Sequence, residues 1–177
     1  MLKHRSHSSG HAHEEHKAHA PQCVTCVVIT CSDTRTSQTD TSGQLMMRLL
    51  KEHGHDLAGY HVIKDDPGQI RHVIEEAAES DAVHAILVNG GTGISKRDST
   101  FEAVDGMLEK RLVGFGELFR YLTYKDIGSS AIMTRATAGV FRGRIVFSTP
   151  GSEGAVRLAM EQLILPELGH IIQQLNK

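Results

Sequence analysis

Tryptophan is missing from this chain of 177 residues, which contains only three tyrosines and five phenylalanines. A basic surplus is missing as well, because 19 lysines and arginines face 21 aspartates and glutamates, for a formal net charge of −2. Nucleic-acid-binding proteins usually carry a basic patch, and those that bind single strands stack bases on aromatic rings. We therefore expect no nucleic-acid partner.

Long apolar runs are also absent, since no stretch approaches the roughly 20 apolar residues that a membrane-spanning helix needs. Residues 3–22 are rich in His, Ser, Glu, Lys and Ala, so that the N-terminus lacks the apolar segment of a secretory signal. We expect a cytoplasmic protein that does not bind a membrane.

Cysteine is scarce, with only Cys23, Cys26 and Cys31 in the whole chain. An odd number of cysteines without a secretion signal does not indicate a disulfide framework. The pair Cys23 and Cys26 lies in a run that resembles a strand, and no second pair exists to complete a zinc site. All three are therefore interpreted as small apolar strand residues.

The first 22 residues form a segment of their own, without apolar periodicity. Such a segment cannot bury enough apolar surface to offset the entropy of ordering it, so it is interpreted as a disordered tail. Its histidines can bind Ni²⁺, Zn²⁺ or Cu²⁺, either incidentally or in a biological role, and both readings stay open. The segment holds six of the twelve histidines: His4, His7, His11, His13, His16 and His19.

From Cys23 onward, patterns typical of strands and helices alternate. Apolar runs predict strands at 23–30, 57–63, 82–88 and 145–149, the last after a turn at Arg142-Gly143. Helical spacing predicts helices around 45–53, 67–78, 99–108, 117–125, part of 128–138, and from about 152 and 166. The alternating order predicts one α/β domain over residues 23–177, with a mostly parallel central sheet and helices on both faces.

Two helix starts have specific signals. Pro67 suits the first turn of a helix, with Asp65 or Asp66 as its N-cap. Ser99 and Glu102 stand at the spacing of a capping box, in which each side chain bonds the other residue's backbone N–H.

Polar, glycine-rich or aspartate-rich segments follow the predicted strands. They are Cys31–Arg35, Lys64–Pro67, Asn89–Thr100 and Thr149–Ser152. In open parallel sheets, ligands bind beyond the carboxyl ends of the strands, so these segments predict one binding rim. The residues gathered there are Ser32, Asp33, Asp65, Asp66, Gly90–Gly93, Arg97, Asp98 and Ser152.

The glycine-rich loop Gly90-Gly-Thr-Gly93 is suited to a phosphate group, because glycine lets backbone N–H groups approach a ligand closely. It is not a Walker A loop, since Lys96 lies between Ser95 and Arg97. It also lacks the third glycine of a dinucleotide-binding fingerprint.

Asp65 and Asp98 lie in different strand-end loops and therefore could flank one Mg²⁺ ion, which needs one or two carboxylates plus phosphate oxygens. In the other reading, Asp65 caps a helix and Asp98 pairs with Lys96 or Arg97. Spacing alone leaves both readings open.

Several of these segments together resemble one known family. Ser32-Asp-Thr-Arg35, Asp40-Thr-Ser-Gly43 and Asn89-Gly-Gly-Thr-Gly-Ile-Ser-Lys-Arg-Asp98 are similar to the signature loops of molybdopterin adenylyltransferases of the MogA/MoaB type. The similarity covers residues 23–172 in order and is nearest to the MoaB branch. Further similar motifs are Gly114-Phe-Gly-Glu-Leu-Phe-Arg120, Thr134-Arg-Ala136, Thr149-Pro-Gly-Ser152 and Ile164-Leu-Pro-Glu-Leu-Gly-His170.

The resemblance implies a three-layer αβα sandwich and a homo-oligomer, either a trimer or a hexamer. It implies an enzyme of molybdenum cofactor biosynthesis that uses Mg²⁺ to transfer AMP from ATP to the terminal phosphate of molybdopterin. The product, adenylyl-molybdopterin, would pass to a downstream molybdenum-insertion protein. The alternative is a protein of the same fold that binds molybdopterin, or serves assembly, without catalysis.

The family's two essential aspartates fall on Asp65 and Asp98, which we assign to catalysis and to Mg²⁺. Arg97 or Arg135 is assigned to anionic groups of the ligand. Substrate or nucleotide binding is predicted for Ser32, Asp33, Thr34, Ser42, Gly43, Gly90, Gly91, Thr92, Gly93, Arg97, Arg135, Pro150, Gly151 and Ser152.

Two residues depart from the family pattern. Lys64 and Phe101 stand where many relatives have proline. Neither change removes a reacting group, but Phe101 alters the rigidity of the first helical turn after Asp98, because proline would fix φ there.

Overall fold

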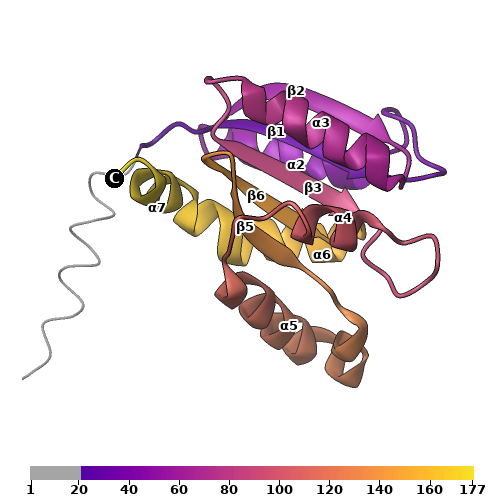
Figure 1. Ribbon diagram of the computed structural model, residues 1–177. Helices are drawn as coiled ribbons and strands as arrows, with labels where there is room; N and C mark the ends of the chain where they lie inside the picture. Colours follow the sequence, from indigo (N-terminus) through magenta and orange to yellow (C-terminus); the bar gives the residue numbers. More distant parts are fainter. Residues whose placement is uncertain (1–20) are drawn as a thin grey trace, which may run out of the picture.

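The computed structural model describes residues 21–177, so the expected tail lies outside the described residues except for its last two positions. The described chain forms one six-stranded sheet in the order β2-β1-β3-β6-β5-β4 (Figure 1). Four strands are parallel, and β5 and β4 form an antiparallel edge. The mostly parallel sheet predicted from the sequence is thereby confirmed. The strands are β1 (Thr25–Cys31), β2 (Asp56–Ile63), β3 (Ala85–Gly90), β4 (Lys110–Arg111), β5 (Thr137–Phe141) and β6 (Arg144–Thr149).

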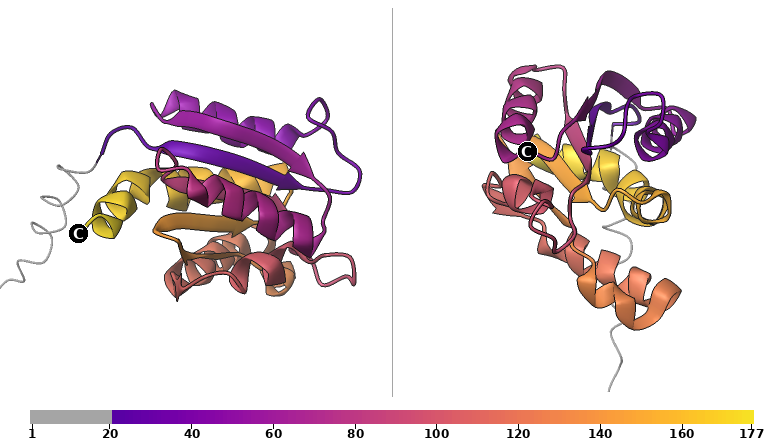
Figure 2. Two further views of the ribbon diagram at one scale, coloured as in Figure 1. Left: turned by 45° about the horizontal axis from the view of Figure 1, so that its top comes forward. Right: turned by 90° about the vertical axis from the view of Figure 1, so that its right-hand side faces the viewer.

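Helices cover both faces of the sheet and complete three layers (Figures 1 and 2). Successive strand residues alternate between two cores. Val28 and Phe147 belong to the core under α2, α5, α6 and α7, whereas Ile29 and Val146 belong to the core under α3 and α4. This alternation confirms the αβα sandwich. The helices are α2 (Thr41–Glu52), α3 (Pro67–Glu79), α4 (Thr100–Asp105), α5 (Val113–Ile127), a 3₁₀ helix η1 (Gly128–Met133), α6 (Glu153–Ala159), a π-helical segment η2 (Met160–Ile164) and α7 (Leu165–Leu175).

The edge strand β5 was not predicted, and its first residues were assigned to a helix. The turn that follows it was recognised: Arg142 and Gly143 have φ of 46° and 74°. Positive φ at both central residues is typical of the two-residue turn of a β-hairpin, and β5 pairs with β6 through it. A strand of five residues containing a glycine gave too weak an apolar pattern to be distinguished from the end of a helix.

The predicted capping box at the start of α4 was wrong. Ser99 occupies the N-cap position, but its side chain makes no cap hydrogen bond, and the helix ends at Asp105 rather than near residue 108. The Ser99 hydroxyl donates instead to Asp65, and the Glu102 carboxylate pairs with Arg135. The predicted start of α3 is confirmed, since Asp66 is its N-cap and Pro67 is its first residue.

The cysteines are free, and Cys26 and Cys31 are buried strand residues as predicted. Cys23 differs, because β1 begins at Thr25 and Cys23 is exposed before it. Strand β3 likewise begins at Ala85, three residues after the predicted start.

The two predicted C-terminal helices run into one another through η2. Pro166 lies in the first turn of α7, directly after the π segment. Among residues 21–177, no helix has the length and apolar character required to cross a lipid bilayer.

Candidate active site

A cavity of ≈ 350 Å³ lies at the carboxyl ends of β1, β3 and β6. This volume is in the ordinary range for small-molecule sites. Burial raises the pKa of the Cys31 thiol to about 12, so the cavity contains no thiolate nucleophile at neutral pH. The lining residues are Thr30, Cys31, Ser32, Thr34, Arg35, Asn89, Gly90, Gly91, Gly151 and Ser152.

The loop after β3 begins with two glycines in a conformation that other residues rarely adopt. The φ angle is 112° at Gly90 and 48° at Gly91. A Cβ atom on Gly90 would collide with the carbonyl oxygen of Cys31, and one on Gly91 would collide with Oδ2 of Asp65. Glycine is therefore required for the loop to pass this close to β1 and to Asp65.

The Asp65 carboxylate joins the loop after β2 to the first turn of α4. Its Oδ1 accepts hydrogen bonds from the backbone N–H of Ser99 at 3.2 Å, the Ser99 hydroxyl at 2.8 Å and the Thr100 hydroxyl at 3.0 Å. Three donors fill the acceptor capacity of Oδ1, which leaves Oδ2, beside Gly91, as the oxygen available for a cation.

Asp98 lies against the same loop. Its Oδ2 accepts the Ser95 N–H at 3.1 Å and would be 2.5 Å from a Cβ on Gly93. The loop thus has a carboxylate oxygen of Asp65 beside Gly91 and one of Asp98 beside Gly93.

The two carboxylates suit a cation that brings phosphate ligands with it. Within residues 21–177, no group of three or more His, Cys, Asp or Glu side chains lies close enough together to hold a metal ion. Mg²⁺ does not need such a group, because one or two carboxylates suffice when substrate phosphates supply the other oxygens. The residues present therefore fit Mg²⁺ bound together with a polyphosphate.

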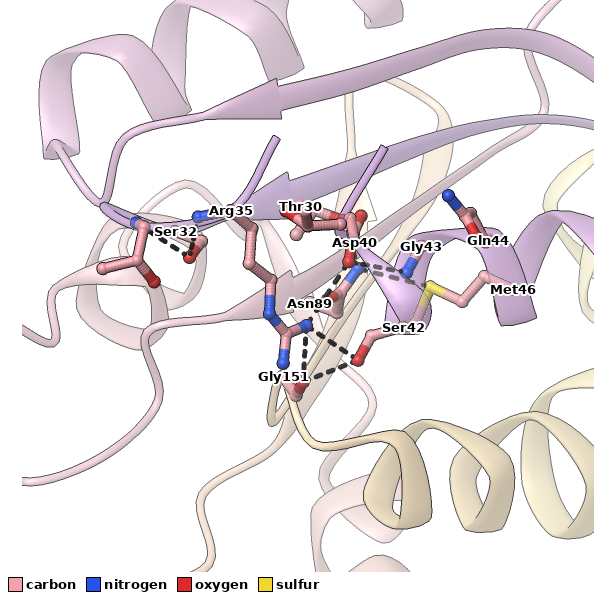
Figure 3. Close-up of polar contacts among 12 residues, drawn as sticks. Thr30, Ser32, Arg35, Asp40, Ser42, Gly43, Gln44, Met46, Asn89 and Gly151 are labelled. Carbon is pink, nitrogen blue, oxygen red and sulfur yellow. Dashed lines mark hydrogen bonds and ion pairs between the residues drawn. The ribbon is translucent and has the colours of Figure 1, made fainter. Parts of the chain in front are cut away.

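A charged network supports the cavity from the start of α2 (Figure 3). Nη1 of Arg35 donates to Asp40 Oδ1 at 3.3 Å, the Ser42 hydroxyl at 2.9 Å and the Gly151 carbonyl at 3.1 Å. Asp40 is fully buried and also accepts the Tyr60 hydroxyl at 2.7 Å. Asp40 thereby holds Arg35 at the cavity wall and balances its charge, while Nε and Nη2 of Arg35 have no acceptor among the described residues and remain available to an anion.

Asn89 forms part of the cavity wall from the end of β3. Its Nδ2 donates to the Thr30 hydroxyl at 2.8 Å (Figure 3). Its Oδ1 is buried and has no hydrogen-bond partner among the described residues. A buried acceptor without a partner is uncommon and frequently marks a functional site.

Comparison with known proteins decides the family. Residues 27–170 match the family described as "Probable molybdopterin binding domain". The chain belongs to this family.

Relatives of this chain include proteins named for molybdenum cofactor biosynthesis. "Molybdenum cofactor biosynthesis protein B" of Bacillus cereus is 54% identical over 164 residues, which cover 92% of this chain and 97% of the relative. A crystal structure of a molybdenum cofactor biosynthesis protein B has a TM-score of 0.86 at 54% identity, covering 89% of this chain and 98% of the other. The tungsten cofactor synthesizing protein MoaB from Pyrococcus furiosus has a TM-score of 0.81 at 34% identity, covering 89% of this chain and 100% of its own.

The predicted site residues fall into three groups in the structure. Six line the cavity: Ser32, Thr34, Gly90, Gly91, Gly151 and Ser152. Others adjoin it through hydrogen bonds or packing: Asp33, Ser42, Gly43, Asp65, Thr92, Gly93 and Asp98. The remaining three lie further out, with Arg97 exposed on the loop, Pro150 on the wall of a neighbouring hollow, and Arg135 bonded to carbonyl groups of the glycine loop. Their roles in binding stay predictions.

Sequence reasoning did not single out Thr30, Arg35 or Asn89 as site residues, although all three line the cavity. Arg35 and Asn89 stand inside quoted motifs, and their position next to a strand end was the available signal. Thr30 carried no signal, because a threonine in an apolar strand is indistinguishable from an ordinary strand residue.

Replacement of Gly91 is expected to damage both stability and ligand binding. In Gly91→Ala, the methyl group meets Asp65 Oδ2 and Thr100 Oγ1 in a backbone conformation with positive φ. We expect a loss of roughly 2–4 kcal/mol in the free energy of unfolding by urea, together with weaker ATP binding by calorimetry.

Gly54→Ala is the matched control, since Gly54 also has positive φ (77°) but no atom lies within 4 Å of its added Cβ. It should lose only about 1–2 kcal/mol and bind ATP normally. Equal losses in the two variants would show that contact with Asp65 does not matter.

Proposed function

We propose that this chain transfers AMP from ATP to the terminal phosphate of molybdopterin, releasing pyrophosphate and adenylyl-molybdopterin. The relatives, which are named for molybdenum cofactor biosynthesis, support the pathway. The observation that carries the reaction is the convergence of a glycine loop, an arginine and two carboxylates at one edge of the sheet.

The cavity suits anionic substrates. Arg35 contributes the Nε and Nη2 donors of its guanidinium, and Ser32, Thr34 and Ser152 contribute hydroxyl groups. Among the described residues, no acceptor pairs with the N–H groups of Thr92 and Gly93, so both are available to phosphate oxygens.

The reaction forms one phosphorus–oxygen bond and breaks another. An oxygen of the molybdopterin phosphate bonds to the α-phosphorus of ATP, while the bond from that phosphorus to the bridging oxygen breaks and the electron pair leaves with pyrophosphate. A phosphate oxygen is already ionised near neutral pH, so the protein does not have to supply a strong base. Alignment and charge neutralisation are the main requirements.

The residues divide these tasks. Asp98 and Oδ2 of Asp65 would hold Mg²⁺, which when bound neutralises phosphate charge. The glycine loop positions phosphate oxygens through its backbone, and Arg35 attracts the anionic groups into the cavity. Asp65 also bonds to Ser99 and Thr100, and thereby fixes the loop after β2 against the start of α4.

The test is an assay of purified protein with molybdopterin, ATP and Mg²⁺, following pyrophosphate release and the adenylylated product by mass spectrometry. Formation of both in equal amounts is expected. Tight molybdopterin binding without either product would contradict catalysis and favour the non-catalytic binding protein.

A further inference from the structure

Arg135, which stands just before β5, contacts the glycine loop. Its Nε donates to the Thr92 carbonyl at 2.8 Å, and its Nη2 donates to the Gly93 carbonyl. Two consecutive peptide groups of the loop are therefore held by one planar guanidinium, whose fixed fork of donors suits such double contacts.

Most of the guanidinium's donors are engaged by the protein. The Glu102 carboxylate forms an ion pair with Nη1, and the guanidinium carbon lies 4.7 Å from the centre of the Phe101 ring. The pairing with Arg135 lowers the pKa of Glu102. Because Glu102 neutralises the charge of Arg135 and the loop carbonyls take two of its donors, little remains for a substrate anion.

The contacts determine where the loop's N–H groups point. In a planar trans peptide, the C=O of one residue and the N–H of the next point in opposite directions. Since the carbonyls of Thr92 and Gly93 face Arg135, the N–H groups of Gly93 and Ile94 face away from it. Neither N–H has an acceptor among the described residues. Gly90 and Gly91, at the start of the same loop, line the cavity, and Asp98 lies against Gly93.

We propose that Arg135 is a positioning residue, which together with Phe101 and Glu102 turns the N–H groups of Gly93 and Ile94 toward the phosphates of the substrate. This inference rests on the proposed function and replaces a direct contact between Arg135 and the ligand. It also gives a purpose to Phe101, which stands where relatives commonly have proline, because the ring packs against the guanidinium face.

The test compares Arg135→Lys, Arg135→Met and Phe101→Leu in the full chain. A lysine keeps the charge but cannot reproduce the fork, so both Arg135 variants should raise the KM for ATP roughly 10-fold, with a smaller effect on kcat. Phe101→Leu should raise it several-fold, and its effect should disappear in the Arg135→Met background. A bound non-hydrolysable ATP analogue should slow amide hydrogen exchange at Gly93 and Ile94 in the wild type, and should slow it less in all three variants.

Arg142→Met is the control, because Arg142 also lies over a phenylalanine ring, at 5.1 Å, and pairs with Glu79 far from the loop. It should leave KM and exchange unchanged. Near-normal KM in Arg135→Lys with a large rise in Arg135→Met would indicate direct charge recognition and overturn the proposal, as would equal protection of Gly93 and Ile94 by the bound analogue in wild type and variants. Binding of a non-hydrolysable ATP analogue gives the same comparison without turnover, so that failure of the adenylyl transfer and failure of the positioning role are distinguished.

Discussion

Asp98→Asn is expected to lower kcat/KM for adenylyl transfer by on the order of 10²-fold or more, even at saturating Mg²⁺. Loss of a group that only orients a metal ligand costs about 10–100-fold, so loss of a direct ligand should cost at least as much. Asparagine has nearly the same shape and keeps an oxygen that can accept the Ser95 N–H. The free energy of unfolding should therefore change little, and the loss should appear in the rate.

The experiment compares initial rates of pyrophosphate release across a series of Mg²⁺ concentrations. Asp81→Asn is the control, because Asp81 is exposed and pairs only with Arg144, at the amino end of β6 and so at the opposite ends of the parallel strands from the cavity. Partial recovery of Asp98→Asn at high Mg²⁺ would agree with a weakened metal site. Wild-type turnover at saturating Mg²⁺ would remove Asp98 from that site.

The part of the site that could be predicted from the sequence is the part set by strand ends. Ser32, Gly90 and Ser152 follow three buried parallel strands, and such strands place their carboxyl ends at one edge. Their convergence on one cavity therefore followed from apolar runs and glycine positions alone, without knowledge of any contact.

The contacts that join the loops could not be predicted in this way. The Ser99 hydroxyl had a local partner in the expected capping box, but Asp65, which is 34 residues away in sequence, takes it. Arg135 was assigned to anionic groups of the ligand, and its hydrogen bonds to the carbonyl groups of Thr92 and Gly93 could not be predicted from the sequence. Long-range hydrogen bonds of this kind replace the expected local ones only after the fold has brought both partners together, so the sequence around either residue does not show them.

Asp40→Ala is expected to cause the largest loss of stability, roughly 3–5 kcal/mol in the free energy of unfolding. The carboxylate is fully buried at the N-cap of α2 and accepts the Gly43 N–H at 3.0 Å and the Tyr60 hydroxyl at 2.7 Å. It also pairs with Arg35. Alanine leaves these donors in place without an acceptor, and each buried donor that loses its partner costs about 1–3 kcal/mol.

Low pH should remove the stability that the ionised Asp40 carboxylate contributes to the fold. Burial opposes ionisation of Asp40, but hydrogen bonds from Thr30, Tyr60 and the Gly43 N–H, with the Arg35 charge, outweigh burial and lower its pKa below the ordinary 3.8. The folded state therefore binds the proton less readily than the unfolded state. The stabilisation is complete above pH 3.8 and is lost as the pH falls through the lowered pKa. The gap in stability between wild type and Asp40→Ala should narrow over that range.

Asp66→Ala provides a matched comparison, since Asp66 also caps a helix but is exposed and accepts only the Gln69 N–H. It should lose about 1 kcal/mol in urea unfolding, the usual value of an N-cap. Similar losses in the two variants would mean that Asp40 acts as a simple cap. A much larger loss at Asp40, accompanied by weaker ATP binding, would show that the network both stabilises α2 and holds Arg35 at the cavity, because removal of one carboxylate releases the arginine that the phosphates need.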